Sequence, residues 1–257
     1  MDINQTNVDR EVISGKTWEA YSNAYFGKKE PLEELWNIFS KQKVKLSENI
    51  TIGDLGGAEG IVGEFFKDKL SKNHKVKLYV IEIIKQLLDK NRNKDTIKLN
   101  EDLRKFVKKD FFDLLLMRSI LHYFSKEEQL QVLKNAHDSI KSGGHLLIQS
   151  FIQNPSDLEL FSKFNHHVKR NLQLLSKEET IDLFRKSGFS EIKELGSLPT
   201  WNLSSKVFQQ RYELTDSEIE ILRKTVENTP TEKRKGFTLD SKSFTIPIPY
   251  AVFLLKK

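Results

Sequence analysis

A short glycine-rich stretch follows an acidic residue in the first quarter of the chain. Asp54 ends an apolar segment, and the turn after it contains Gly56, Gly57, Ala58 and Gly60. Small side chains let a ligand approach the backbone, whose free amides can face a carboxylate or hydroxyl groups. The acid can bind an ammonium group, directly or through a water. The alternative is an ordinary strand-to-helix turn, and the acids farther along the chain favour the ligand site.

Two more acids follow at intervals that suit one bound ligand. Glu82 lies about 20 residues beyond the turn, at the end of the next apolar segment, where a carboxylate can accept hydrogen bonds from both ribose hydroxyls. Asp102 is placed to accept a hydrogen bond from an adenine amino group, while Leu103 offers a backbone amide and Ile83 an apolar contact to the ring. Together these residues describe a pocket for an adenosine.

The segment that carries these residues resembles the class I S-adenosylmethionine-dependent methyltransferases of the small-molecule type. Those enzymes have an acid and three glycines at alternate positions, and Asp54, Gly56, Ala58 and Gly60 match that pattern with alanine in place of the middle glycine. A dinucleotide oxidoreductase is the nearest rival. The first glycine of its fingerprint is missing here, and the strand-end acid Asp54 fits S-adenosylmethionine better.

The resemblance implies S-adenosylmethionine as the cofactor and carries its binding residues over position by position. Glu82 would be the ribose acid, Asp102 and Leu103 would lie at the adenine, and Arg118 with Ser119 would border the methionine moiety. The predicted cofactor-binding residues are therefore Asp54, Gly56, Gly57, Ala58, Gly60, Glu82, Ile83, Asp102, Leu103 and Arg118.

Methyl transfer from a sulfonium is an in-line displacement, so the protein must align the acceptor and exclude water. A base is needed only if the nucleophile arrives protonated. His122, just after the fourth predicted strand, is the candidate catalytic base, and a packing role is the alternative. His166 and His167 are adjacent and lack a third ligand nearby, so no metal is predicted.

The elements that position these residues alternate between strands and helices, which favours an α/β fold with a largely parallel sheet covered on both faces. The resemblance implies a Rossmann-like sheet of seven strands, mostly parallel, with the last strand antiparallel. The predicted strands are 50–55, 76–81, 96–99, 112–117, 145–151, 189–195 and 244–255. Capping boxes predict helix starts at Ser125, Ser176 and Thr215.

The predicted organisation is an N-terminal helical lid segment, 1–43, followed by the S-adenosylmethionine-binding methyltransferase domain, 44–257. Insertions at about 154–175 and 196–242 interrupt that domain. Trp18, Tyr21 and Tyr25 recur at helical spacing in the lid segment and would cover the cofactor or acceptor, with core packing as the alternative. Trp201, Arg211 and Tyr212 in the second insertion would shape the acceptor site or a dimer surface.

Composition narrows the class of partner. The 257 residues carry a net charge of +6 without cysteine, which excludes a cysteine nucleophile and thiolate metal sites. The excess charge comes mainly from lysine, and the nine arginines are scattered along the chain, so nucleic acid is not the expected partner. We expect a cytoplasmic enzyme without a membrane partner. It would methylate a small molecule on an O, N or C atom, and a homodimer is possible. The alternatives are an RNA or protein methyltransferase and a non-catalytic cofactor-binding protein.

Overall fold

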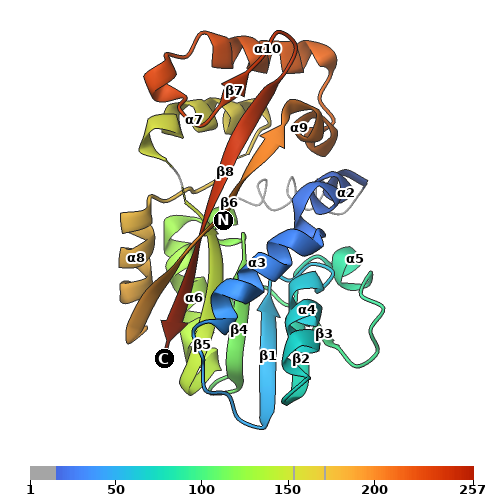
Figure 1. Ribbon diagram of the computed structural model, residues 1–257, viewed down its shortest axis with the longest axis vertical. Helices are drawn as coiled ribbons and strands as arrows, with labels where there is room; N and C mark the ends of the chain where they lie inside the picture. The colour runs from blue at the N-terminus through green and yellow to red at the C-terminus, as the bar shows by residue number, and fades with distance from the viewer. Residues whose placement is uncertain (1–15, 153, 171) are drawn as a thin grey trace.

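An eight-stranded sheet runs through the computed structural model, which describes residues 16–152, 154–170 and 172–257 (Figure 1). The strand order is β3-β2-β1-β4-β5-β8-β6, and β7 pairs with β8. The strands are β1 Asn49–Leu55, β2 Lys75–Ile81, β3 Ile97–Leu99, β4 Phe112–Arg118, β5 Ile140–Phe151, β6 Glu191–Ser204, β7 Thr238–Leu239 and β8 Phe244–Lys256.

The first five strands are parallel, whereas β8 runs antiparallel to both β5 and β6. The predicted Rossmann-like α/β fold is confirmed, and all seven predicted strands are present. The eighth strand, β7, was not predicted, because two residues are too few to show a periodic pattern. It pairs Thr238 with Thr245 and Leu239 with Phe244 on β8.

Helices cover both faces of the sheet (Figure 1). They are α2 Lys16–Tyr21, η1 Ser22–Phe26, α3 Lys29–Ser40, α4 Ile61–Leu70, α5 Lys85–Leu88, η2 Leu121–Tyr123, α6 Lys126–Ser139, η3 Pro155–Asp157, α7 Leu158–His167, α8 Lys177–Lys186, α9 Ser205–Tyr212, α10 Asp216–Glu227 and η4 Thr231–Lys233. The capping boxes at Ser125, Ser176 and Thr215 all form, so the three predicted helix starts are confirmed.

The two faces of the sheet bury two separate apolar cores, because side chains alternate along each strand. On β4, Leu114 and Leu116 join the core that contains α3 and α4 residues, while Leu115 and Met117 join the core under α6 and α8. The sheet is therefore fixed from both sides, which gives the residues at its strand ends a rigid base.

The predicted N-terminal helical segment, 1–43, is divided into α2, η1 and α3 in its described part, and residues 1–15 lie outside the described residues. The break falls at Gly27, whose backbone amide donates to the Ser22 carbonyl and closes η1. Helix α3 starts anew at Lys29 with Pro31 in its first turn, where a missing amide hydrogen costs no helical bond.

The two predicted insertions contain regular structure. The range 154–175 holds η3 and α7, and 196–242 begins with the rest of β6 before α9, α10, η4 and β7. Strand β6 was predicted to end at Leu195 but continues to Ser204, with pairing shifts on either side of Leu198. A strand that shifts register loses the regular alternation by which its sequence would be identified.

Candidate functional site

The turn after β1 places the Asp54 carboxylate beside a glycine-rich backbone segment. Asp54 is 1% exposed, and its Oδ2 accepts a hydrogen bond of 2.9 Å from the Gly63 amide on α4. A Cβ on Gly57 would lie 2.7 Å from the Asp54 carboxylate, so only glycine fits there. Gly56 has a φ of +65°, which glycine adopts without strain. Burial, opposed by the Gly63 hydrogen bond and the Arg118 charge, raises the Asp54 pKa to about 7.

Glu82, at the end of β2, connects the turn to the next helix. Its Oε2 accepts from the Ala58 amide at 3.0 Å, and its Oε1 accepts from the Ile84 amide at 2.8 Å. Burial raises the Glu82 pKa, although these backbone hydrogen bonds act against the rise. The two bonds fix the carboxylate at the strand edge and leave further lone pairs on each oxygen.

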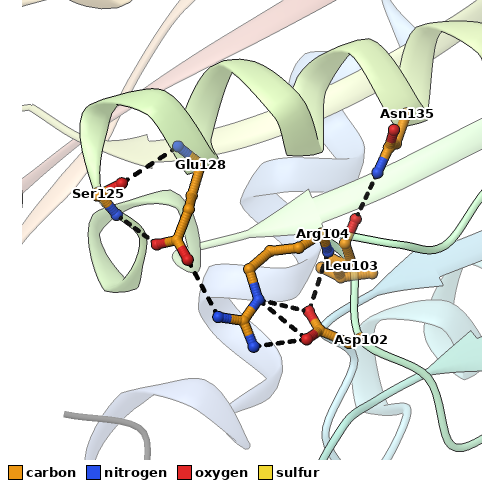
Figure 2. Close-up of polar contacts among 6 residues, drawn as sticks. All are labelled: Asp102, Leu103, Arg104, Ser125, Glu128 and Asn135. Atoms are coloured by element: carbon orange, nitrogen blue, oxygen red, sulfur yellow. Dashed lines mark hydrogen bonds and ion pairs between the residues drawn. The ribbon is translucent and has the colours of Figure 1, made fainter. Parts of the chain in front are cut away.

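Asp102, beyond β3, is held by a residue that the sequence did not single out. Arg104 donates from Nε to Asp102 Oδ1 at 2.9 Å and from Nη2 to Asp102 Oδ2 at 2.5 Å, and from Nη1 to Glu128 Oε1 at 3.0 Å. Figure 2 shows this chain of contacts from Asp102 to the capping box of α6. Burial alone would raise the Asp102 pKa, but the Arg104 hydrogen bonds outweigh it and hold that pKa below its usual range.

Arg118 ends β4 inside the protein, with 8% of its surface exposed. Its Nε donates to Gln149 Oε1 at 3.0 Å and its Nη1 to the Phe26 carbonyl at 3.1 Å. The guanidinium also lies over the rings of Tyr25 and Phe26, 5.3 and 5.1 Å from their centroids. The strand end is thereby connected to η1.

A cavity of about 240 Å³ unites these residues. Of the predicted cofactor-binding residues, Gly60 alone does not line it: Gly60 is the buried N-cap residue of α4, with a φ of +81°. The other predicted cofactor-binding residues and the candidate base do line the cavity: Asp54, Gly56, Gly57, Ala58, Glu82, Ile83, Asp102, Leu103, Arg118 and His122.

The cavity lies beyond the carboxyl ends of β1 and β4. These two neighbours are where the strand order reverses, because β2 and β3 continue to one side of β1 and β5 to the other side of β4. Loops leave such a point in opposite directions and open a crevice, which is the usual ligand position in open α/β sheets. The topology therefore explains why the cavity forms at this edge.

His122 lies in η2 and lines the cavity. The centroid of its ring is 4.3 Å from that of Tyr123 and 6.1 Å from that of Phe151. Burial, together with the positive charge of Arg170, lowers the His122 pKa to about 3. The imidazole is consequently neutral near pH 7. It can accept a hydrogen bond, but it holds a transferred proton weakly.

The aromatic side chains predicted for the lid meet those of the second insertion over the cavity. Tyr25 stacks on Trp201 with ring centroids 5.1 Å apart, and on Tyr250 of β8 at 5.5 Å. Tyr21 makes an edge contact with Trp201 at 5.0 Å. Trp18, Tyr21, Trp201 and Tyr212 all line the cavity.

Two arginines of the site, Arg104 and Arg170, were not predicted from the sequence. Arg170 is 6% exposed, lines the cavity and donates from Nη1 to the Tyr212 hydroxyl at 2.5 Å. Arg104 connects its near neighbour Asp102 to Glu128 in α6, 24 positions away, and Arg170 contacts Tyr212 in α9, 42 positions away. No local spacing marks such a pair, and a short motif signals only neighbours along the chain.

Residues 16–152, 154–170 and 172–257 contain no group of three or more histidine, aspartate or glutamate side chains arranged to hold a metal ion. Within the same ranges, every helix is too short or too polar to cross a lipid bilayer.

Comparisons with known proteins agree on a family. A sequence model described as the O-methyltransferase domain matches residues 19–196. The chain is 28% identical over 187 residues to O-methyltransferase 12 of Dictyostelium discoideum, a match that covers 68% of this chain and 49% of the relative. The chain thus spans about half the length of that curated relative.

Two solved structures share the fold. The YcgJ protein from Bacillus subtilis superposes with a TM-score of 0.71 at 13% identity, covering 90% of this chain and 99% of that one. The N-methyltransferase NodS from Bradyrhizobium japonicum, in complex with S-adenosyl-L-homocysteine, gives a TM-score of 0.57 at 14% identity and covers 100% and 99% of the two chains. With a family match over more than half of its residues and the Rossmann-like sheet described above, the chain belongs to the O-methyltransferase domain family of S-adenosylmethionine-dependent methyltransferases.

Proposed function

We propose that this chain transfers a methyl group from S-adenosylmethionine to an oxygen atom of a small organic molecule. The observation that supports this most is one cavity, at the reversal point of the sheet, that is lined by Asp54, Glu82 and His122. The two acids suit opposite ends of the cofactor, and the histidine lies beyond them. Membership of the O-methyltransferase domain family favours oxygen among the possible acceptor atoms.

The cofactor would supply an electrophilic methyl group on a sulfonium. The residues that would hold it are Asp54, Gly56, Gly57, Ala58, Gly60, Glu82, Ile83, Asp102, Leu103 and Arg118. Asp54 would bind the ammonium of the methionine end, since a buried carboxylate gains most from a cation placed beside it. Gly60 would act indirectly, by giving the turn its shape.

Glu82 would bind the ribose. A carboxylate offers about four lone-pair sites, and the Ala58 and Ile84 amides use one on each oxygen. One site per oxygen is then left for the two ribose hydroxyls. At the adenine, Ile83 would contact the ring, and Asp102 would share its carboxylate between Arg104 and the amino group.

The acceptor would lie between the lid and the second insertion, beside aromatic rings from these two segments and from β5 and β8. Phe151, Trp201, Tyr212 and Tyr250 present flat apolar surfaces there. Such surfaces exclude water and bind a flat or apolar molecule. The lid segment, 1–43, would close over the ligands, while 44–257 would bind them.

His122 is the proposed catalytic residue. With a pKa of about 3 it stays neutral and can accept a hydrogen bond from an acceptor hydroxyl. An anionic acceptor beside Arg170 would offset the positive charge that lowers this pKa, so the base would strengthen when its substrate is bound. The acceptor can also arrive already ionised, and then His122 only orients it.

Calorimetry with S-adenosylmethionine and S-adenosylhomocysteine tests the cofactor assignment. Asp54→Ala and Glu82→Ala are each expected to weaken binding by about tenfold or more, since each removes a charge-assisted contact. Glu48 is an exposed acid just before the amino-terminal end of β1, and the Glu48→Ala variant is the matched control that should bind normally. If the wild type binds neither ligand, the proposal is wrong.

Incubation with a labelled methyl donor and fractionated cell extract tests the acceptor class. Label in the small-molecule fraction supports the proposal, and the labelled product identifies the acceptor. Label confined to RNA or protein would replace it with the macromolecular alternative. Cofactor binding without transfer to any fraction would indicate a non-catalytic binding protein.

A further inference from the structure

Arg118 connects the floor of the cavity to its cover. Its guanidinium reaches from the end of β4 to η1, where Nη1 donates to the Phe26 carbonyl at 3.1 Å. On the other side, Nε donates to Gln149 Oε1 at 3.0 Å, and Gln149 Nε2 in turn donates to the Tyr25 hydroxyl at 3.4 Å. Arg118 and Gln149 therefore connect the ends of β4 and β5 to η1 by hydrogen bonds.

One nitrogen of this guanidinium is not used. Nη2 is buried and has no hydrogen-bond partner among the described residues, although Arg118 lines the cavity. A buried cation with a spare N–H group favours an anionic acceptor, and a guanidinium matches the shape of a carboxylate. The unused donor therefore indicates where a ligand carboxylate would bind.

The surroundings favour one end of the proposed cofactor as the source of that carboxylate. Asp54 and Arg118 are close enough for each charge to stabilise the other. A carboxylate and an arginine side by side complement an α-amino-acid group, whose ammonium and carboxylate are adjacent and of opposite sign. The methionine end of S-adenosylmethionine has this arrangement.

We propose that Arg118 Nη2 binds the carboxylate of the amino-acid end of the cofactor and thereby makes closure of residues 18–26, the part of the lid segment that contains the cavity-lining Trp18 and Phe26, depend on that carboxylate. The inference rests on the proposed function, because it takes S-adenosylmethionine as the ligand. A bound carboxylate fixes the guanidinium, which then holds the Phe26 carbonyl and supports the rings of Tyr25 and Phe26. The lid closes only over a cofactor that carries its amino-acid group.

The competing explanation is that Arg118 only clamps η1 to the sheet. A clamp of that kind would hold the lid to the same extent whatever ligand fills the adenosine part of the cavity. The two explanations differ for a ligand without the amino-acid group. 5′-Methylthioadenosine is such a ligand, since it keeps the adenosine and the thioether of S-adenosylhomocysteine.

Hydrogen exchange of the amides of residues 18–26 measures lid closure directly. With the wild type, saturating S-adenosylhomocysteine should slow exchange in the lid, while saturating 5′-methylthioadenosine should leave it near the ligand-free rate. Equal protection by both ligands would overturn the inference and leave the proposed function intact. If neither ligand binds, the proposed function fails, and the inference fails with it.

Two substitutions separate binding from coupling. Arg118→Met should weaken S-adenosylhomocysteine by about tenfold or more, the loss expected for a charge-assisted contact, and leave 5′-methylthioadenosine nearly unchanged. Arg118→Lys keeps a positive charge for the carboxylate, but a lysine ammonium cannot donate to Phe26 and Gln149 at the same time in the planar geometry of the guanidinium. It should retain much of the affinity and lose the lid protection. Arg92→Met, at an exposed position, is the matched control, and an equal loss of both ligands in Arg118→Met would contradict the inference.

Discussion

Arg104 approaches the Asp102 carboxylate side-on, with Nε and Nη2 donating to its two oxygens, while the Arg104 backbone amide adds a third donor at 3.0 Å to Oδ1. Glu128 holds the remaining end of the guanidinium. The acid proposed to meet the adenine is thus kept ionised and fixed in orientation before any ligand arrives. A carboxylate that does not have to reorganise binds a donor at a smaller entropic cost.

Replacing Arg104 should therefore affect both stability and binding. Arg104→Met keeps the apolar stem but removes both ion pairs, and we expect the free energy of unfolding to fall by about 1 kcal/mol, the upper range for partly exposed pairs. The affinity for S-adenosylhomocysteine should fall severalfold, because Asp102 is then free to rotate. Urea denaturation and calorimetry measure the two effects. Lys134→Met, at an exposed position of α6, should change neither, and tighter binding in Arg104→Met would show that Arg104 competes with the adenine.

Much of this site could be predicted because its residues follow strand ends. Asp54 and Arg118 are in the last two positions of a parallel strand and Glu82 directly follows one, and parallel strands bring such positions to one end of the sheet. The contacts between distant segments could not be predicted. Arg118 donates to a carbonyl 92 positions away at Phe26, and no periodic pattern encodes such a pair. The contact of Arg104 with Glu128 could not be predicted for the same reason, because it depends on how α6 packs.

Cofactor affinity should depend on pH through Asp54. Its pKa is raised to about 7 by burial, so roughly half of the ligand-free protein carries a neutral Asp54 near neutral pH. The ammonium of the cofactor binds the ionised form, so affinity should rise as the pH increases from 6 to 8. Calorimetry in buffers of different ionisation enthalpy should detect proton release on binding. In Asp54→Asn this dependence should disappear; if it persists, another group is responsible.

The same carboxyl group should affect the stability of the ligand-free protein in the opposite direction. Asp54 holds its proton more tightly when folded than when unfolded, because burial raises its pKa from 3.8 to about 7. Its stabilising contribution is complete below about pH 4 and is lost as the pH rises through 7. Asp54→Asn stays uncharged and should be more stable than the wild type at pH 8, by on the order of 2 kcal/mol. Urea titrations at pH 5 and pH 8 would test this, and an equal stability difference at both values would contradict it.

His122 should remain neutral across the physiological range. Burial and the charge of Arg170 lower its pKa to about 3, so its ring resonances should not shift between pH 5 and 8 in an NMR titration, with His122→Asn used for assignment. Arg170→Met removes the positive charge and should raise the His122 pKa. In turnover assays, His122→Asn should lower kcat by about tenfold or more, the range for a lost acid–base group, and leave KM for the cofactor unchanged. Unchanged turnover would exclude a catalytic role.

Two glycine-to-alanine substitutions, one at Gly57 in the turn after β1 and one at Gly143 in β5, separate a steric clash from backbone strain. A Cβ at Gly57 would lie 2.7 Å from the Asp54 carboxylate and 3.0 Å from Val80, so Gly57→Ala must displace the acid or the turn. We expect S-adenosylhomocysteine affinity to fall by about tenfold or more, as for loss of the Asp54 contact itself. Gly143 has a φ of +76° and open space around it, so Gly143→Ala strains only the backbone. That control should lose about 1 kcal/mol of stability through its left-handed conformation and bind the ligand normally. If calorimetry and urea denaturation instead show the same loss of affinity for both variants, general destabilisation rather than the close approach at Asp54 accounts for the effect.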